Sequence, residues 1–225
     1  MEKNSKEVES NQTGVHEDLM TVLNRFKENQ YKKPYAIHTV EVYRETYKGD
    51  LLDYSPVILD LGCGTAKSTL HLADMFKESM VLGIDKSEVR LSKSDTQIKN
   101  TKTLHCDLVD FIRLMKNEGR KSDLTCLFYP NPWPKKEHLK RRIHAHPFFK
   151  DLVDVSKEFV MRTNWKTLAE ETKISYEYYS GKELYLSEVD VEVGNEMTAF
   201  EKKYSHSDQC LYEVGTTPNW KELKL

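Results

Sequence analysis

Three aspartates stand where short apolar runs give way to polar, helix-like stretches. Asp60 precedes a Gly-Cys-Gly turn at 62–64, and Asp85 and Asp107 follow the next two apolar runs. An aspartate at a strand-to-helix junction is commonly just a helix N-cap, so one alone is weak evidence for a binding site. Three carboxylates on successive strand ends, with a Gly-x-Gly turn on the first, instead predict a shared small-molecule site.

The chemistry of these groups fits a nucleoside that carries an amino-acid tail. Glycine lets the backbone turn sharply and approach a ligand closely, because it has no Cβ atom. The dinucleotide pattern G-x-G-x-x-G is not met, because Lys67 holds the third glycine position, and no G-K-[ST] completes a P-loop. Asp60 suits the ammonium group of S-adenosylmethionine, Asp85 its ribose hydroxyls, and Asp107 the exocyclic amine of its adenine. The expected cofactor-side residues are Asp60, Gly62, Gly64, Asp85, Lys86, Asp107 and Leu108.

A proline-rich, basic loop follows the fourth apolar run, which covers 124–129. Prolines within 130–134 restrict its backbone and can hold the side chain of Asn131 near a methyl donor. The dense positive charge that follows suits phosphate contacts. Such a cluster is usually a solvated face, but its place directly after a strand that borders the cofactor site favours substrate binding. The cluster consists of Lys135, Lys136, Lys140, Arg141 and Arg142.

The overall composition gives no nucleic-acid signal, so any basic binding surface must be local. The formal net charge is -2, with 31% charged and 38% hydrophobic residues. A Tyr-Lys-Lys-Pro-Tyr segment at 31–35 is either a second nucleic-acid contact or a solvated connection. No apolar run approaches the ~18 residues that a membrane span needs.

The histidines and cysteines do not predict a metal site. His138, His144 and His146 lack a neighbouring carboxylate or cysteine set, and the four cysteines form no C-x-x-C pair. Cysteines within apolar runs are typical of reduced, core-facing thiols. Residues 1–14 are polar, lack the apolar core of a signal peptide, and are expected to form a disordered tail. We therefore expect a cytoplasmic protein, as a monomer or a homodimer.

The elements that must position these residues alternate between apolar runs and amphipathic stretches. Helical periodicity from residue 19 predicts an N-terminal helical extension within 15–50, ahead of a main domain over 51–225. Repeated β-α units with apolar strands predict a mostly parallel sheet with helices on both faces and ligands at the carboxyl ends of its strands. Strands are expected at 57–61, 80–84, 103–106, 124–129, 159–162, 184–193 and 210–214, and helices at 19–26, 68–76, 88–99, 108–115 and 165–179.

Three motifs together resemble the bacterial tRNA (guanine-N7)-methyltransferases. The run from Tyr129 to Arg142 is similar to their aromatic-Pro-Asp-Pro-Trp-x-Lys loop with its double arginine. Thr-Asn-Trp at 163–165 resembles their Thr-Asp-Trp strand end, and Thr-Ala-Phe-Glu at 198–201 resembles their Thr-x-Phe-Glu motif. The resemblance implies a Rossmann-like class I S-adenosylmethionine-dependent methyltransferase fold, with a seven-stranded sheet, and tRNA as the partner. It also implies that Asn131 is cofactor-side and that Lys135, Asn164, Thr198 and Glu201 are substrate-side.

Two asparagines depart from the family pattern, which typically has aspartate at both positions. Asn131 and Asn164 keep the size of aspartate but lose its charge, and Ala66 replaces a typical glycine. Guanine N7 already carries a lone pair, so Asn131 would act in catalysis by positioning the base and through its carbonyl dipole. Glu201 is a candidate compensating carboxylate. Two alternatives stay open: another RNA base or a small molecule as the methyl acceptor, and a non-catalytic partner subunit.

Overall fold

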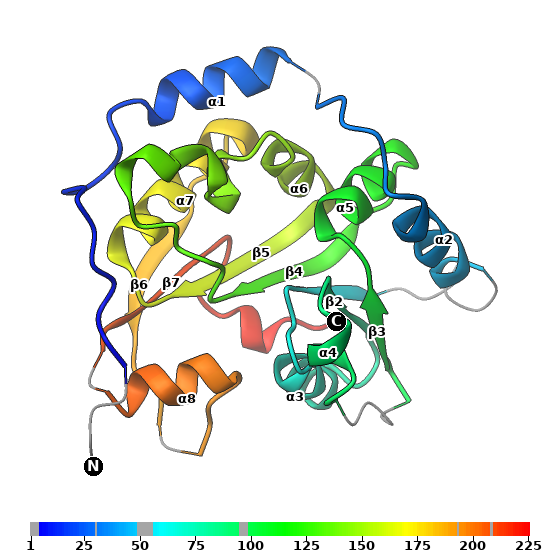
Figure 1. Cartoon of the computed structure of the whole chain (residues 1–225). Helices are drawn as coiled ribbons and strands as arrows, with labels where there is room; N and C mark the ends of the chain where they lie inside the picture. Colours follow the sequence, from blue (N-terminus) through cyan, green and yellow to red (C-terminus); the bar gives the residue numbers. More distant parts are fainter. Residues whose placement is uncertain (1–4, 30, 49–55, 95–98, 193, 208) are drawn as a thin grey trace.

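Seven strands form one sheet, in the order β3-β2-β1-β4-β5-β7-β6, within the described part of the chain (Figure 1). The computed structural model describes residues 5–29, 31–48, 56–94, 99–192, 194–207 and 209–225. β7 is antiparallel to both of its neighbours and the other pairs are parallel, which confirms the predicted sheet. The strands are β1 (Val57–Leu61), β2 (Met80–Asp85), β3 (Thr101–His105), β4 (Ser122–Phe128), β5 (Ser156–Thr163), β6 (Tyr185–Val189) and β7 (Leu211–Gly215).

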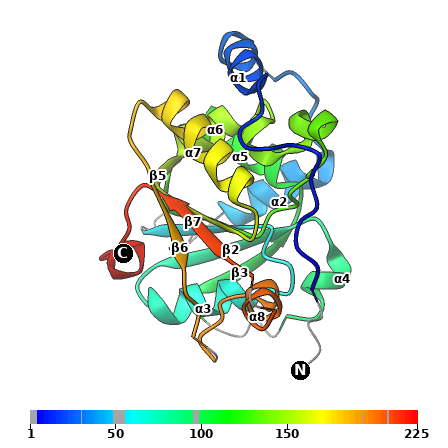
Figure 2. The ribbon, with the colours of Figure 1, turned by 90° about the vertical axis from the view of Figure 1, so that its left-hand side faces the viewer.

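Helices cover both faces of the sheet, as the alternating sequence pattern predicts (Figure 2). They are α1 (Leu19–Glu28), α2 (Ile37–Thr46), α3 (Lys67–Met75), α4 (Glu88–Leu91), α5 (Leu108–Asn117), α6 (Phe149–Val155), α7 (Lys166–Ser180) and α8 (Ala199–Ser205), with 3-10 turns η2 (Lys136–Arg141), η3 (Ile143–Ala145) and η4 (Trp220–Glu222). Leu59 of β1 belongs to an apolar cluster that includes side chains of α2, α5, α6 and α7, whereas its neighbour Ile58 belongs to a second cluster that includes side chains of α3 and η4. Alternate side chains of a strand point to opposite faces, so a strand covered on both faces needs a continuous apolar sequence.

The strand order reverses between β1 and β4, because the chain moves outward from β1 to β2 and β3 and then returns to β4. Asp60 near the end of β1 is paired in register with Cys126 near the end of β4. The glycine turn after β1 and the basic loop after β4 (residues 129–142) therefore begin side by side. Ligands of such sheets bind at this switch point.

The helix predicted over 88–99 is much shorter, because α4 ends at Leu91. α4 buries none of its side chains, and the Ser94 hydroxyl donates to the Leu91 carbonyl at 2.6 Å. Serine bonds of this kind compete with the continuation of a helix. Residues 95–98 lie outside the described residues.

The strand predicted over 184–193 is also shorter and ends at Val189. Its neighbour β7 begins at Leu211, which pairs with Val189. β6 therefore ends at the residue where its pairing with β7 ends.

An extended N-terminal segment lies along the side of the molecule over residues 5–14, where the polar sequence predicts a disordered tail. It runs from the neighbourhood of α8 toward the start of α1 (Figures 1 and 2). The Ser10 hydroxyl donates to the Pro134 carbonyl at 2.6 Å, and the Gln12 amide donates to Glu171 at 2.7 Å. Specific polar partners thus hold a segment whose composition alone predicts disorder. Residues 1–4 lie outside the described residues.

Candidate functional site

The glycine turn after β1 adopts left-handed backbone at three positions. Gly62, Gly64 and Ala66 have φ angles of 74°, 60° and 59°. The Gly62 amide donates to the Ile84 carbonyl at 2.7 Å, which ties the turn to β2. A Cβ atom added at Gly62 or Gly64 would meet nothing within 4 Å, so a ligand has room beside this backbone. Ala66 holds the third position with strain of about 1 kcal/mol that glycine would avoid.

Asp60 lies beneath the turn and is only 1% exposed. The hydroxyls of Ser68 and Thr69, at the start of α3, donate to its Oδ2 at 2.6 Å and 2.7 Å. Burial raises the pKa of the Asp60 carboxyl to about 6, against the lowering effect of these hydrogen bonds. A cation beside Asp60 would favour the ionised form, so this carboxyl fits the expected ammonium group.

Asp85 ends β2 next to the turn and is 2% exposed. Its Oδ2 accepts a hydrogen bond from the Gly64 amide at 2.9 Å. Its Oδ1 accepts from the Ser87 amide at 2.8 Å and from the Arg90 guanidinium at 2.9 Å. A carboxylate has about four acceptor positions, so two ribose hydroxyls would need the Arg90 side chain to move away. Lys86, the next residue, is exposed.

Asp107 is the N-cap of α5. Its Oδ1 accepts from the amides of Val109 at 2.8 Å and Asp110 at 3.4 Å. Capping accounts for an aspartate here without any ligand. The contact with adenine therefore stays a prediction, and it would use Oδ2. Leu108, which is half-buried, begins the helix beside it.

The basic loop contains two aromatic residues with left-handed backbone, Tyr129 at φ 52° and Trp133 at φ 45°. Such a backbone is strained and persists only where surrounding contacts hold it. Asn131 lies between them and is exposed, and its Oδ1 accepts from the Trp133 amide at 3.2 Å. The orientation of Asn131 is thus coupled to the backbone of Trp133.

The predicted basic cluster divides into exposed and buried members. Lys135, Lys136, Lys140 and Arg141 are exposed, and the Lys136 ammonium pairs with Glu17 at 2.6 Å. The guanidinium of Arg141 lies 5.0 Å from the centre of the Trp133 ring. These four side chains can reach phosphates from one continuous loop.

Arg142 differs from the expectation of a phosphate contact, because its side chain is fully buried. Its Nη1 donates to Glu171 of α7 at 2.6 Å, and its Nε donates to the Trp133 carbonyl at 3.2 Å. Burial without a partner is very costly for a charge, and the Glu171 carboxylate supplies that partner. Arg142 therefore shapes the basic loop from inside, whereas its neighbour Arg141 faces solvent.

Thr198 and Glu201 form the start of α8, where the family resemblance predicts substrate contacts. The Thr198 hydroxyl accepts from the Glu201 amide at 2.9 Å, as in the S/T-x-x-E capping box. Glu201 is fully buried and accepts from Arg162 of β5 at 2.6 Å and from the Tyr129 hydroxyl at 3.1 Å. Glu201 thus anchors α8 to the beginning of the basic loop and is already paired, so it does not supply the compensating carboxylate.

Asn164, the other predicted substrate-side residue, follows β5. Its Nδ2 donates to Gln209 Oε1 at 2.8 Å, and Gln209 in turn donates to the Ser5 carbonyl at 3.3 Å. Asn164 is half-buried. Its amide thus joins the end of β5 to Gln209, and it is Gln209 that contacts the N-terminal segment.

Three charged or polar residues that hold the basic loop escaped the sequence analysis. Arg162 pairs with Glu201 and, at 2.7 Å, with Glu213 of β7. Glu171 and Gln12 bind Arg142 at 2.6 Å and 2.9 Å. The sequence could have indicated the role of Arg162, because a charged residue inside an apolar strand needs a buried partner. Gln12 gave no signal within its polar segment.

The aromatic residues of the 31–35 segment enclose an arginine. The guanidinium of Arg113, which is 7% exposed, lies 4.9 Å from the Tyr31 ring centre and 4.3 Å from that of Tyr35. Lys32 and Lys33 are exposed. The rings therefore serve the packing of α5, and the two lysines are the part of this segment that can meet a phosphate.

No group of three or more His, Cys, Asp or Glu side chains that could hold a metal occurs among the described residues. His144 is fully buried, with its Nε2 3.0 Å from Glu171. Cys63, Cys106 and Cys126 are buried free thiols. Within the same residues, no helix is both long and apolar enough to cross a membrane.

Affinity for the expected cofactor should fall as the pH drops below about 6, the pKa of the buried Asp60 carboxyl. Below this pKa, binding of an ammonium group must first remove a proton from Asp60, which costs up to about tenfold in affinity per pH unit. Calorimetry with S-adenosylhomocysteine from pH 5 to 8 measures this. The Asp60→Asn protein should bind weakly at every pH without the slope, and an equally flat wild-type profile would contradict the ammonium contact.

Comparisons with known proteins bear on the same region. A family model described as "Putative methyltransferase" (Methyltransf_4) matches residues 54–214. The "tRNA (guanine-N(7)-)-methyltransferase" of Streptococcus pneumoniae strain CGSP14 is 29% identical over 172 residues, which cover 71% of this chain and 80% of that protein. The protein of the same name from strain TIGR4 has the same identity and coverage.

Two solved structures share the fold at low sequence identity. An antibiotic-related methyltransferase has a TM-score of 0.54 and 16% identity, with 82% of this chain and 96% of that chain covered. The 16S rRNA methyltransferase KamB has a TM-score of 0.52 and 14% identity, with 83% and 96% covered.

Proposed function

Because the chain belongs to the Methyltransf_4 family, whose model spans residues 54–214, we propose that it methylates N7 of a guanine in tRNA. It is an S-adenosylmethionine-dependent methyltransferase by family and fold. The observation that carries the choice of acceptor is the basic loop, which begins beside the glycine turn and exposes Lys135, Lys140 and Arg141. The name of the Streptococcus pneumoniae relatives supports the same acceptor. We also propose that it acts in the cytoplasm as a monomer or a homodimer.

Methyl transfer to guanine N7 requires mainly that the protein places the two reactants correctly. S-adenosylmethionine supplies an activated methyl group on a sulfonium. Guanine N7 has its lone pair at neutral pH, so no residue of this chain has to remove a proton first. Asp60 and Asp85 hold the donor, Asn131 orients the base, and the exposed basic side chains hold the RNA backbone. Positive charge grows on the guanine during transfer, and the Asn131 carbonyl dipole offsets part of it.

Asn131→Asp should increase the rate constant of methyl transfer to guanine N7 about three- to tenfold. A carboxylate stabilises the growing positive charge more strongly than an amide dipole does, although the exposure of this position screens the gain. Single-turnover kinetics with saturating cofactor measure the effect, with Asn131→Ala as the variant that should be slower than wild type. If the aspartate variant is no faster, the side chain at position 131 does not stabilise positive charge at guanine N7.

One experiment separates the proposed function from its alternatives. The purified protein is incubated with methyl-labelled S-adenosylmethionine and unmodified bulk tRNA, and methylated positions are mapped by mass spectrometry. Methyl groups on guanine N7 support the proposal. Transfer to another base, or only to a small molecule, supports the alternative of a different methyl acceptor. Cofactor binding without any transfer supports a non-catalytic partner subunit.

Charge reversal at Lys140 and Arg141 to glutamate should weaken tRNA binding at least about tenfold and reduce its salt dependence, because phosphate contacts are lost. Arg142 is left unchanged, since its side chain is buried. Filter binding over a salt series gives both quantities, while cofactor affinity should stay as in wild type. The matched control reverses Lys77 and Lys182, which follow α3 and α7 at the opposite edge of the sheet. Equal tRNA affinity in both double variants would remove the loop from the interface.

A further inference from the structure

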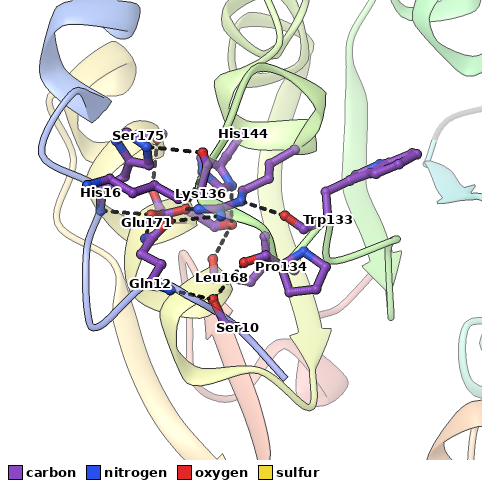
Figure 3. Close-up of polar contacts among 12 residues, drawn as sticks. Ser10, Gln12, His16, Trp133, Pro134, Lys136, His144, Leu168, Glu171 and Ser175 are labelled. Carbon is purple, nitrogen blue, oxygen red and sulfur yellow. Dashed lines mark hydrogen bonds and ion pairs between the residues drawn. The ribbon is translucent and has the colours of Figure 1, made fainter. Parts of the chain in front are cut away.

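An N-terminal strap, residues 10–17, covers part of the basic loop (Figure 3). The Ser10 hydroxyl donates to the Pro134 carbonyl at 2.6 Å, and the Lys136 amide donates to Asn11 Oδ1 at 2.8 Å. The His16 ring Nε2 lies 3.2 Å from the Lys136 carbonyl. Three backbone groups of the loop, at Pro134 and Lys136, are therefore bound by side chains of the strap, from more than 100 residues away along the chain.

Glu171 lies at the centre of this contact and is fully buried (Figure 3). Its Oε1 accepts from Gln12 Nε2 at 2.7 Å and from the His16 amide at 2.9 Å. Its Oε2 accepts from Arg142 Nη1 at 2.6 Å. Burial alone would raise the pKa of the Glu171 carboxyl, but the contacts with His144 and Arg142 lower it to about 2. The pair is therefore ionised at neutral pH.

Gln12 bridges both members of the ion pair. Its Nε2 donates to Glu171, and its Oε1 accepts from Arg142 Nη2 at 2.9 Å. A primary amide suits this place, because one planar group carries a donor for the carboxylate and an acceptor for the guanidinium. A carboxylate at this position would repel Glu171, and an ammonium would repel Arg142.

The strap connects to Asn131 through the backbone of Trp133. Arg142 Nε donates to the Trp133 carbonyl at 3.2 Å, and the Trp133 amide donates to Asn131 Oδ1 at 3.2 Å. Trp133 is left-handed at φ 45°, a conformation that persists only when its neighbours hold it. Hydrogen bonds therefore connect Gln12 to Arg142, Arg142 to the backbone of Trp133, and this backbone to the side chain of Asn131.

We propose that the strap is a positioning element of the methyl-acceptor site, in which Gln12 orients Arg142 and thereby fixes Trp133 and Asn131. The role of Asn131 in methyl transfer rests on the proposed function, whereas the series of hydrogen bonds from Gln12 to Asn131 does not. Neither Gln12 nor Arg142 needs to touch the RNA or the cofactor. Both are positioning residues.

The test compares Gln12→Ala with Glu9→Ala, a control at an exposed residue just before the strap. We expect the alanine at Gln12 to speed amide hydrogen exchange at Lys136 and Trp133 at least tenfold. It should lower the turnover number for methyl transfer at least tenfold while cofactor affinity stays within twofold. Gln12→Glu should have the larger effect on both readouts, and Glu9→Ala none.

Unchanged exchange rates at Lys136 and Trp133 in both Gln12 variants would overturn the proposal. So would faster exchange with undiminished turnover, because the loop would then not need the strap. If wild-type protein transfers no methyl group to tRNA, the proposed function fails, while the exchange comparison still decides whether the strap holds the loop.

Discussion

Replacement of Asp85 by alanine is expected to weaken the binding of S-adenosylhomocysteine at least about 100-fold, which corresponds to ~2.7 kcal/mol. The two ribose hydroxyls are expected to donate to the Asp85 carboxylate, and each hydrogen bond to a charged group contributes about 1.5–3 kcal/mol. Asp85 also holds the Gly64 amide at 2.9 Å, so its loss loosens the glycine turn as well. Calorimetry at pH 7.5 measures the dissociation constant.

Asp85→Asn is the matched variant, because it keeps the size of the side chain and one acceptor oxygen. It should fall between wild type and alanine. Thermal unfolding of the unliganded proteins separates a loss of ligand contacts from a loss of the fold. An affinity within threefold of wild type for the alanine variant would mean that Asp85 serves only the turn and Arg90.

Arg142→Ala is expected to reduce the free energy of unfolding by about 3 kcal/mol or more, because it leaves the Glu171 carboxylate buried without its cation. For a chain of this size such a loss lowers the melting temperature by roughly 6–12 °C. Arg141→Ala, one residue away and exposed, should change stability by less than about 0.5 kcal/mol. Urea unfolding followed by circular dichroism gives both values.

The pH dependence of this difference is a further check. The pKa of Glu171 is about 2 in the folded protein against an ordinary value of 4.5. Its ionised form therefore stabilises the fold above about pH 4.5, and this contribution is lost as the pH falls toward 2. The gap between wild type and Arg142→Ala should be largest near pH 8 and should narrow as the pH falls, because without Arg142 burial raises the pKa of Glu171 in the folded variant and protonation then relieves the unpaired charge. A gap that stays constant down to pH 3 would contradict the ion pair as its source.

The cofactor half of the molecule was predictable because its signals are local. Apolar runs set the strands, and the glycines and Asp60 sit at fixed offsets from the first of them. The acceptor half depends on contacts between distant segments, which local patterns do not encode. Two adjacent arginines, Arg141 and Arg142, look alike in the sequence, and only the position of Glu171 decides that the second points inward.

The motif at 198–201 illustrates a signal with two meanings. Thr-x-x-Glu predicts a capping box on local grounds and a substrate contact by family resemblance. The structure supports the local reading for Thr198 and buries Glu201 against Arg162. The N-terminal segment shows the opposite difficulty, because its few apolar residues predict disorder while Gln12 has a buried partner 159 positions later.

The 159 positions between Gln12 and Glu171 affect the order in which parts of the protein form during synthesis. At about 5–20 residues per second, Glu171 leaves the ribosome roughly 8 to 30 s after Gln12. Through that interval the strap has no carboxylate to bind, although β1, β2 and β3 are made before it ends. A nascent chain would thus have the strands of its donor site well before its acceptor loop takes shape, which delays a working methyltransferase until nearly the whole polypeptide exists.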